Sequence, residues 1–159
     1  IFDVGDEYHP PYFEHMLRLN PCFKRMSTKN IPVVNAGSPF RMFPKPIPEF
    51  VSGINHHMMF HKSWLNELFL MVQSANSQGS PFWRIFIESV KEHLKHSTDT
   101  IESGASEYEL YFHFVLQFHP KDIVLRKLNW INARKNTDIE KFSYEKTGLD
   151  FVSVCHWMT

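Results

Sequence analysis

The pattern of apolar and polar residues divides the chain into short blocks separated by turn-forming residues. Residues 1–4 read as a strand. Residues 11–19 carry apolar side chains at helical spacing, behind a proline that suits a first helical turn and ahead of an Asn-Pro stop. Residues 27–50 contain repeated prolines, which exclude a long helix and a central strand. This region is therefore expected to cross the surface as an ordered loop or a lid.

The middle of the chain predicts one strand and two helices. The strand covers residues 50–60, in which Gly53 indicates a bulge or a close backbone approach. One helix is expected to begin with Ser63 as its cap, and the next is opened by Ser80-Pro81.

A fourth helix, the most apolar, follows a turn of small residues at Ser103 and Gly104. Ser106 is a suitable N-cap, and Glu109 stands three residues later, where the acid of a capping box belongs. The residues up to Phe118 are apolar on nearly every face, which is typical of a buried helix. Its first turn also carries Glu107. Both acids can cap the helix, or Glu107 can face a ligand outside the helix N-terminus.

The end of the chain returns to strands. Residues 122–128 and 151–157 alternate and are rich in β-branched side chains, whereas residues 132–146 are polar and read as a loop or a short exposed helix. Strands separated by helices predict an α/β fold, with a mixed sheet flanked by helices, in a single domain spanning residues 1–159.

The charge balance and residue composition bear on which kinds of partner the chain could bind. Seventeen basic residues balance seventeen acidic ones, so net charge gives no reason to expect nucleic acid or an anionic membrane as the main partner. No apolar run approaches the ~20 residues that span a bilayer, so no membrane segment is expected in this chain. Cys22 and Cys155 form neither a disulfide framework nor a zinc spacing. The high aromatic content fits a well-packed domain or a sugar-stacking surface.

Histidines supply most of the other candidate chemistry, since the chain contains ten of them. His56 and His57 are neighbours in a predicted strand, so at most one faces a cleft, and the alternative is one exposed and one core histidine. His156 could ligate a metal and Trp157 could stack on a sugar or base, or both could simply anchor the end of a strand. No Gly-rich phosphate loop, nucleophile elbow or helical zinc-protease motif is present.

Several blocks of the sequence resemble a known family when they are taken together. The blocks are Glu7–Met16, Asn55–Phe60, Pro81–Trp83, Ser103–Phe112 and Val154–Trp157. In order and spacing they are similar to the DUF6492-type, nucleotide-diphospho-sugar-transferase-like proteins, and the Ser-Gly-Ala-Ser-Glu-Tyr-Glu run is the most specific part. The resemblance covers most of the chain.

This resemblance implies a glycosyltransferase-A-type fold with a nucleotide half followed by an acceptor half. It implies a divalent metal on an Asp-x-Asp motif, with His156 matching a late histidine that completes the metal shell. Glu107 matches the acid that faces the acceptor. The motif itself is expected before Ile1, so the chain resembles the later, acceptor-side part of the domain and could lack the first nucleotide-binding strands. Substrate contacts are implied for His56, His57, Ser103, Gly104, Ser106 and Trp157.

The chemistry of sugar transfer from a nucleotide-diphosphate sugar to a glycan or other hydroxyl acceptor is consistent with these residues. Mn²⁺ or Mg²⁺ neutralises the leaving diphosphate, and an imidazole ligand favours manganese. Where transfer inverts the configuration of the sugar, a carboxylate such as Glu107 deprotonates the acceptor hydroxyl. The rival hypothesis is a non-catalytic glycan- or protein-binding module derived from a transferase half. A hydrolase using Glu107 and Glu109 together is disfavoured, because helix residues diverge by about 100° per step.

Overall fold

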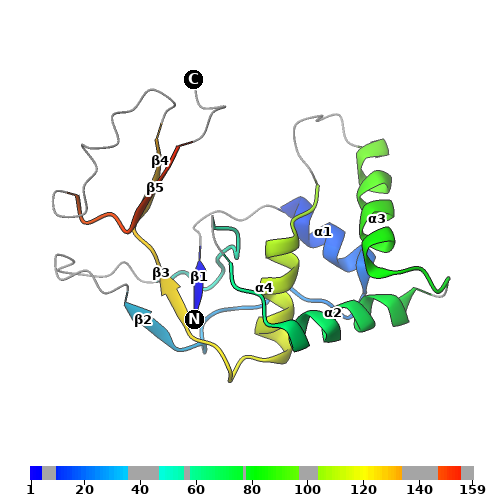
Figure 1. Cartoon of the computed structure of the whole chain (residues 1–159), viewed down its shortest axis with the longest axis horizontal. Helices are drawn as coiled ribbons and strands as arrows, with labels where there is room; N and C mark the ends of the chain where they lie inside the picture. The colour runs from blue at the N-terminus through cyan, green and yellow to red at the C-terminus, as the bar shows by residue number, and fades with distance from the viewer. Residues whose placement is uncertain are drawn as a thin grey trace.

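The computed structural model describes residues 1–4, 10–35, 47–55, 58–76, 78–96, 104–133 and 147–154. In this part of the chain the fold is α/β, with four helices and five short strands (Figure 1). The elements are β1 (Phe2–Val4), α1 (Pro10–Leu19), β2 (Val33–Asn35), α2 (Lys62–Ala75), α3 (Phe82–His96), α4 (Glu107–Phe118), β3 (Leu125–Lys127), β4 (Trp130–Ala133) and β5 (Phe151–Val154).

The described strands form two small parallel sheets. Strand β3 lies between β1 and β2, with Leu125 opposite both Phe2 and Val33. Strands β4 and β5 pair separately, with Trp130 opposite Phe151. Parallel neighbours need a long connection, and α2, α3 and α4 lie in the connection between the paired strands β2 and β3. The α/β class agrees with the sequence prediction, whereas the described strand pairs are all parallel rather than mixed.

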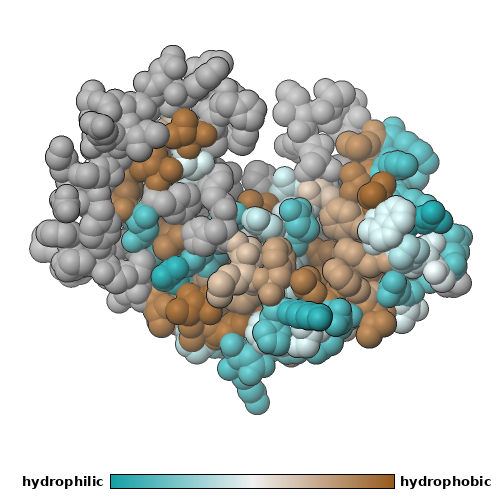
Figure 2. All heavy atoms as spheres, in the orientation of Figure 1, coloured by the Kyte–Doolittle hydropathy of each residue, from teal (hydrophilic) through white to brown (hydrophobic). Residues whose placement is uncertain are grey.

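Helix α4 forms the centre of the core. All residues from Glu109 to Leu116 are buried, as the apolar sequence predicted. Helices α1 and α2 both pack against α4. The ring of Phe2 contacts those of Tyr111 and Phe112, so α4 also packs against the three-stranded sheet. Hydrophobic atoms also reach the surface over the helical side of the molecule (Figure 2).

Two predictions about local structure need correction. The strand expected over residues 50–60 is reduced to a single bridge at Ser52 among its described residues, and no helix or strand forms around it. The cap expected at Ser63 is also wrong, because α2 begins at Lys62 with His61 as the N-cap residue. The Ser63 hydroxyl bonds instead to Nδ1 of His61, at 2.8 Å.

Residues 27–50 contain a strand, β2, despite their prolines. Strand β2 follows Pro32 directly and occupies an edge of the three-stranded sheet, the position that tolerates a neighbouring proline. The carbonyl of Pro32 accepts a hydrogen bond from the Leu125 amide at 2.8 Å, so this segment joins the sheet despite the ring. Strand β4 was likewise not expected at Trp130–Ala133.

Candidate functional site

The N-terminus of α4 is built as the sequence predicts. Gly104 has a φ of +63°, a left-handed conformation that glycine adopts without steric penalty. Ser106 then caps the helix, its hydroxyl accepting from the Glu109 amide at 3.3 Å. Glu107 lies in the first turn with its side chain exposed to solvent. The turn and cap therefore present the Glu107 carboxylate at the surface.

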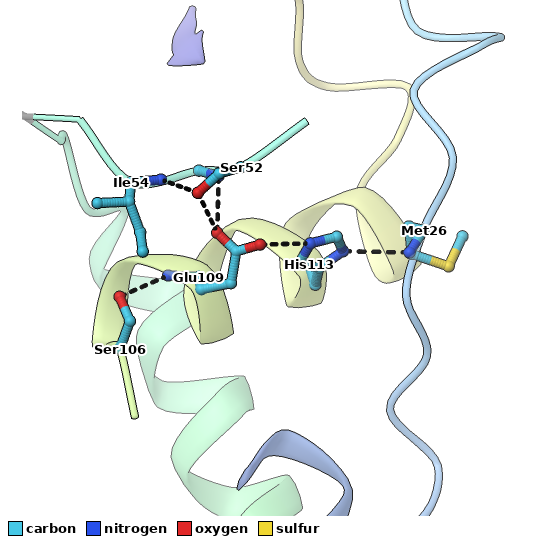
Figure 3. Close-up of polar contacts among 7 residues, drawn as sticks. Met26, Ser52, Ile54, Ser106, Glu109 and His113 are labelled. Atoms are coloured by element: carbon cyan, nitrogen blue, oxygen red, sulfur yellow. Dashed lines mark hydrogen bonds and ion pairs between the residues drawn. The ribbon is translucent and has the colours of Figure 1, made fainter. Parts of the chain in front are cut away.

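Glu109 departs from the capping-box role expected for it. Its side chain is fully buried, and the carboxylate turns into the core (Figure 3). Oε2 accepts from the Ser52 hydroxyl and from the Gly53 amide, both at 2.8 Å. Oε1 lies 3.1 Å from Nε2 of His113, one helical turn further on. The Ser106 half of the capping box therefore forms, whereas the Glu109 carboxylate bonds to Ser52, Gly53 and His113 instead.

His113 completes this buried network. Its Nδ1 accepts a hydrogen bond from the Met26 amide at 3.1 Å, so the ring proton belongs on Nε2, which donates to Glu109. His113 is 1% exposed, so each of these polar groups depends on the others for its partner. Sequence reasoning missed His113. The available signal was a Glu and a His four residues apart on an otherwise apolar helix.

Gly53 allows this close association. A Cβ on Gly53 would overlap the Cβ of Phe112, so only glycine lets the chain approach α4 here. The close backbone approach expected at Gly53 is therefore confirmed, although it occurs in an irregular segment rather than in a strand.

The first half of α4 gathers segments that are distant in sequence. The Tyr111 hydroxyl accepts from the His61 amide at 2.8 Å, and the Phe60 ring contacts the rings of Tyr108 and Tyr111. Phe13, on α1, lies with its ring centroid 4.4 Å from that of His113. Burial raises the pKa of the Tyr111 phenol, and the hydrogen bond from His61 lowers it by a smaller amount.

A cavity of about 250 Å³ opens beside β1. Arg126 forms two hydrogen bonds with the Asp3 carboxylate, Nε to Oδ1 at 2.5 Å and Nη2 to Oδ2 at 2.8 Å, and this carboxylate raises the pKa of Arg126. The Asn55 side chain donates to the Asp3 carbonyl. The lining residues are Ile1, Phe2, Asp3, Asn55, Met58, Met59 and Arg126.

The predicted site residues divide into two groups. Glu107, Gly104 and Ser106 are described, and all three belong to the start of α4. Glu107 does not line the cavity beside β1. The remaining predicted residues lie outside the described part of the chain: His56, His57, Ser103, His156 and Trp157.

The described residues contain neither a cluster of metal-ligating side chains nor a helix that could span a membrane. Within those ranges, no group of three or more His, Cys, Asp or Glu side chains is arranged to hold a metal ion. The predicted ligand His156 lies outside them. No helix in the described part is long and apolar enough to cross a membrane.

No protein-family model, curated protein or solved structure matches this chain.

Proposed function

We propose that this chain belongs to a metal-dependent glycosyltransferase that moves a sugar from a nucleotide-diphosphate sugar to an acceptor hydroxyl. The observation that supports the proposal is the convergence of sequence blocks on α4. Asn55–Phe60 and Ser103–Phe112, both part of the resemblance to nucleotide-sugar transferases, are joined by the ring contacts of Phe60 with Tyr108 and Tyr111. Phe13, from a third block, contacts His113.

The two acids of the Ser103–Phe112 block suit different tasks. Glu109 already accepts from Ser52, Gly53 and His113 in a dry environment, so its oxygens are committed to the fold. Glu107 is exposed, and the helix below it is held rigidly by those same buried bonds. Removal of a proton from an acceptor hydroxyl requires an accessible carboxylate, and the anchored helix sets the position of the Glu107 backbone. We therefore assign the general base to Glu107.

A divalent cation, Mn²⁺ or Mg²⁺, would neutralise the charge of the diphosphate leaving group when bound. Its proposed protein ligand in this chain is His156. Asp3, the acid that lines the cavity beside β1, is held by two bonds from Arg126, so its carboxylate is already neutralised by a cationic side chain. The other metal ligands are therefore expected from outside the described residues.

A second candidate is a binding module without catalysis. The position of Glu107 favours it, because this carboxylate is exposed and does not line the cavity beside β1. In this alternative the aromatic residues around α4 hold a glycan or a protein segment, and Glu107 contributes only to capping.

The test is a transfer assay on the natural protein that contains this sequence, with a panel of nucleotide sugars and Mn²⁺. The Glu107→Gln variant should lose about 10²- to 10⁴-fold in turnover, because a general base contributes on that scale, while nucleotide-sugar affinity measured by calorimetry is retained. Glu88→Gln, an exposed acid on α3, is the matched control and should be fully active.

Two results would reject parts of this proposal. Undiminished turnover in Glu107→Gln would remove Glu107 as the base. Failure of the unmodified protein to bind or turn over any nucleotide sugar in the presence of Mn²⁺ would instead favour the binding module.

A further inference from the structure

Helix α3 carries a second apolar face that the core does not use. Its inner face packs through Phe82, Ile85 and Phe86, and the ring of Phe86 lies 4.6 Å from that of His15 on α1. Trp83, Ile87 and Leu94 are nevertheless 58%, 44% and 43% exposed. With the intermediate residue Val90 they form one row, called here the α3 seam: Trp83, Ile87, Val90 and Leu94.

The spacing of the α3 seam is that of a helix-packing surface. Its members follow one another at intervals of four, three and four residues, the spacing of the a and d positions of a heptad. At about 100° per residue they span about 60° of the helix circumference. A stripe this narrow matches the seam of a coiled coil, whereas helices that lie on membranes present a broader apolar face.

The charges beside the seam define the partner. Arg84 and Lys91, both exposed, border the seam directly on one flank, and the Arg84 guanidinium lies over the Trp83 ring at 5.4 Å from its centroid. Glu88, also exposed, lies further round the helix on the same side. Lys95 lies on the same side, with its ammonium 2.7 Å from the Glu92 carboxylate. A second copy packed antiparallel on the seam would bring Arg84 and Lys91 against their own counterparts, which like-charge repulsion disfavours. A helix with acidic residues on its matching flank would be attracted.

We propose that the α3 seam docks an amphipathic helix of a partner protein that carries acidic residues beside its own apolar row. The position of α3 permits this, because the helix stands at one end of the molecule (Figure 1). In the space-filling view hydrophobic atoms run along α3 with hydrophilic ones beside them (Figure 2). This surface is separate from Glu107 and does not depend on the proposed transferase activity.

The experiment uses two designed 21-residue helical peptides that share Leu and Ile at their a and d positions. One carries Glu at every e and g position, and the other carries Lys. Binding to the full chain is measured by fluorescence anisotropy at physiological salt. The Glu peptide should bind at least tenfold more tightly than the Lys peptide. A double variant, Arg84→Glu with Lys91→Glu, should reverse this preference, since complementary flanking charges select the partner of a helix.

The Ile87→Glu variant tests whether the seam itself is used. It should abolish binding of the Glu peptide, and because Ile87 is half exposed the variant should keep its helical circular dichroism and unfolding midpoint. Equal affinity for both peptides, no binding of either, or binding that survives Ile87→Glu would overturn the proposal.

Two further measurements distinguish a partner helix from a second copy of the chain and from a membrane surface as the occupant of the seam. Sedimentation that shows a dimer dissociated by Ile87→Glu would assign the seam to a second copy. Co-sedimentation with phosphatidylglycerol vesicles that is lost in Ile87→Glu, without peptide discrimination, would assign it to a membrane surface. Either result would overturn the partner-helix proposal.

Discussion

Helices α3 and α4 are both rich in apolar residues, and they use them differently. In α4 the residues from Glu109 to Leu116 are all buried, including a glutamate and a histidine. In α3 only one face packs against the core, while Trp83 and Leu94 remain exposed and the charged residues point to solvent. A buried polar side chain requires a partner at a fixed position, whereas a solvated one can rely on water. Substitutions of the buried residues of α4 and of the groups that contact them should therefore have large effects, and those on the exposed face of α3 small ones.

The largest effect is expected from Glu109→Gln. The amide that replaces one carboxylate oxygen would face a donor, either the Ser52 and Gly53 pair or Nε2 of His113. His113 cannot compensate by moving its proton, because Nδ1 already accepts from the Met26 amide. A buried donor left without an acceptor in this way lowers the free energy of unfolding by about 1 to 3 kcal/mol for each unsatisfied group. Urea denaturation followed by circular dichroism measures the loss.

Glu107→Gln is the control for this prediction, since it makes the same chemical change two residues earlier on an exposed side chain. Its free energy of unfolding should change by about 0.5 kcal/mol or less. Equal losses in the two variants would show that the buried network does not distinguish α4 from an ordinary surface helix.

Gly53→Ala should have the next largest effect. The new methyl group would overlap Phe112, whose side chain is completely buried and cannot move aside. Overpacking of this kind lowers stability by about 1 to 3 kcal/mol. The comparison is Gly79→Ala, between α2 and α3, where a Cβ meets open space and only the left-handed φ of +64° opposes it. That variant should lose about 1 kcal/mol. A smaller loss at Gly53 than at Gly79 would contradict the close contact with α4.

Tyr111→Phe should have a moderate effect that depends on pH. The change removes the oxygen that accepts from the His61 amide at the start of α2, which lowers the free energy of unfolding by about 1 kcal/mol at neutral pH. Because burial raises the pKa of Tyr111 in the folded state above the usual 10.0, the unfolded chain loses this proton first. The contribution is therefore complete below pH 10 and falls as the pH rises through the folded-state pKa.

Unfolding of wild type and Tyr111→Phe should thus be compared at pH 7 and at several values above pH 10. The difference in free energy between them should shrink at the higher values, since the other tyrosines titrate equally in both proteins. A difference that stays constant with pH would indicate that Tyr111 is not protected from solvent.

The sequence predicts much of this contrast, because local patterns determine it. The continuous apolar run after Ser106 predicts a buried α4, and Gly104 and Ser106 predict the turn and cap that begin it. The sequence alone is consistent with Glu107 either capping the helix or facing outward, and in the structure its side chain is exposed.

Tertiary contacts account for what the sequence did not predict. Residues 50–55 have the composition of a strand, yet their polar groups bond to Glu109, which stands 57 residues beyond Ser52. No local pattern reveals a partner so distant in sequence. The predictions of a strand over residues 50–60 and of a capping box at Glu109 therefore both fail because of this one tertiary contact. The pairing of His113 with Met26, 87 residues apart, is hidden in the same way. The site residues His56, His57, Ser103, His156 and Trp157 stay predictions.

The smallest effects are expected on the α3 seam. Ile87→Ala and Leu94→Ala should each change the free energy of unfolding by about 0.5 kcal/mol or less, because both side chains are more than 40% exposed and alanine favours the helix. Leu110→Ala on α4, where the leucine is 1% exposed, should instead lose about 2 to 5 kcal/mol. Losses on α3 that approached the α4 value, and that grew with protein concentration, would mean that the seam is already covered by a second copy in solution. That result would assign the row of side chains to the second copy and overturn the partner-helix proposal.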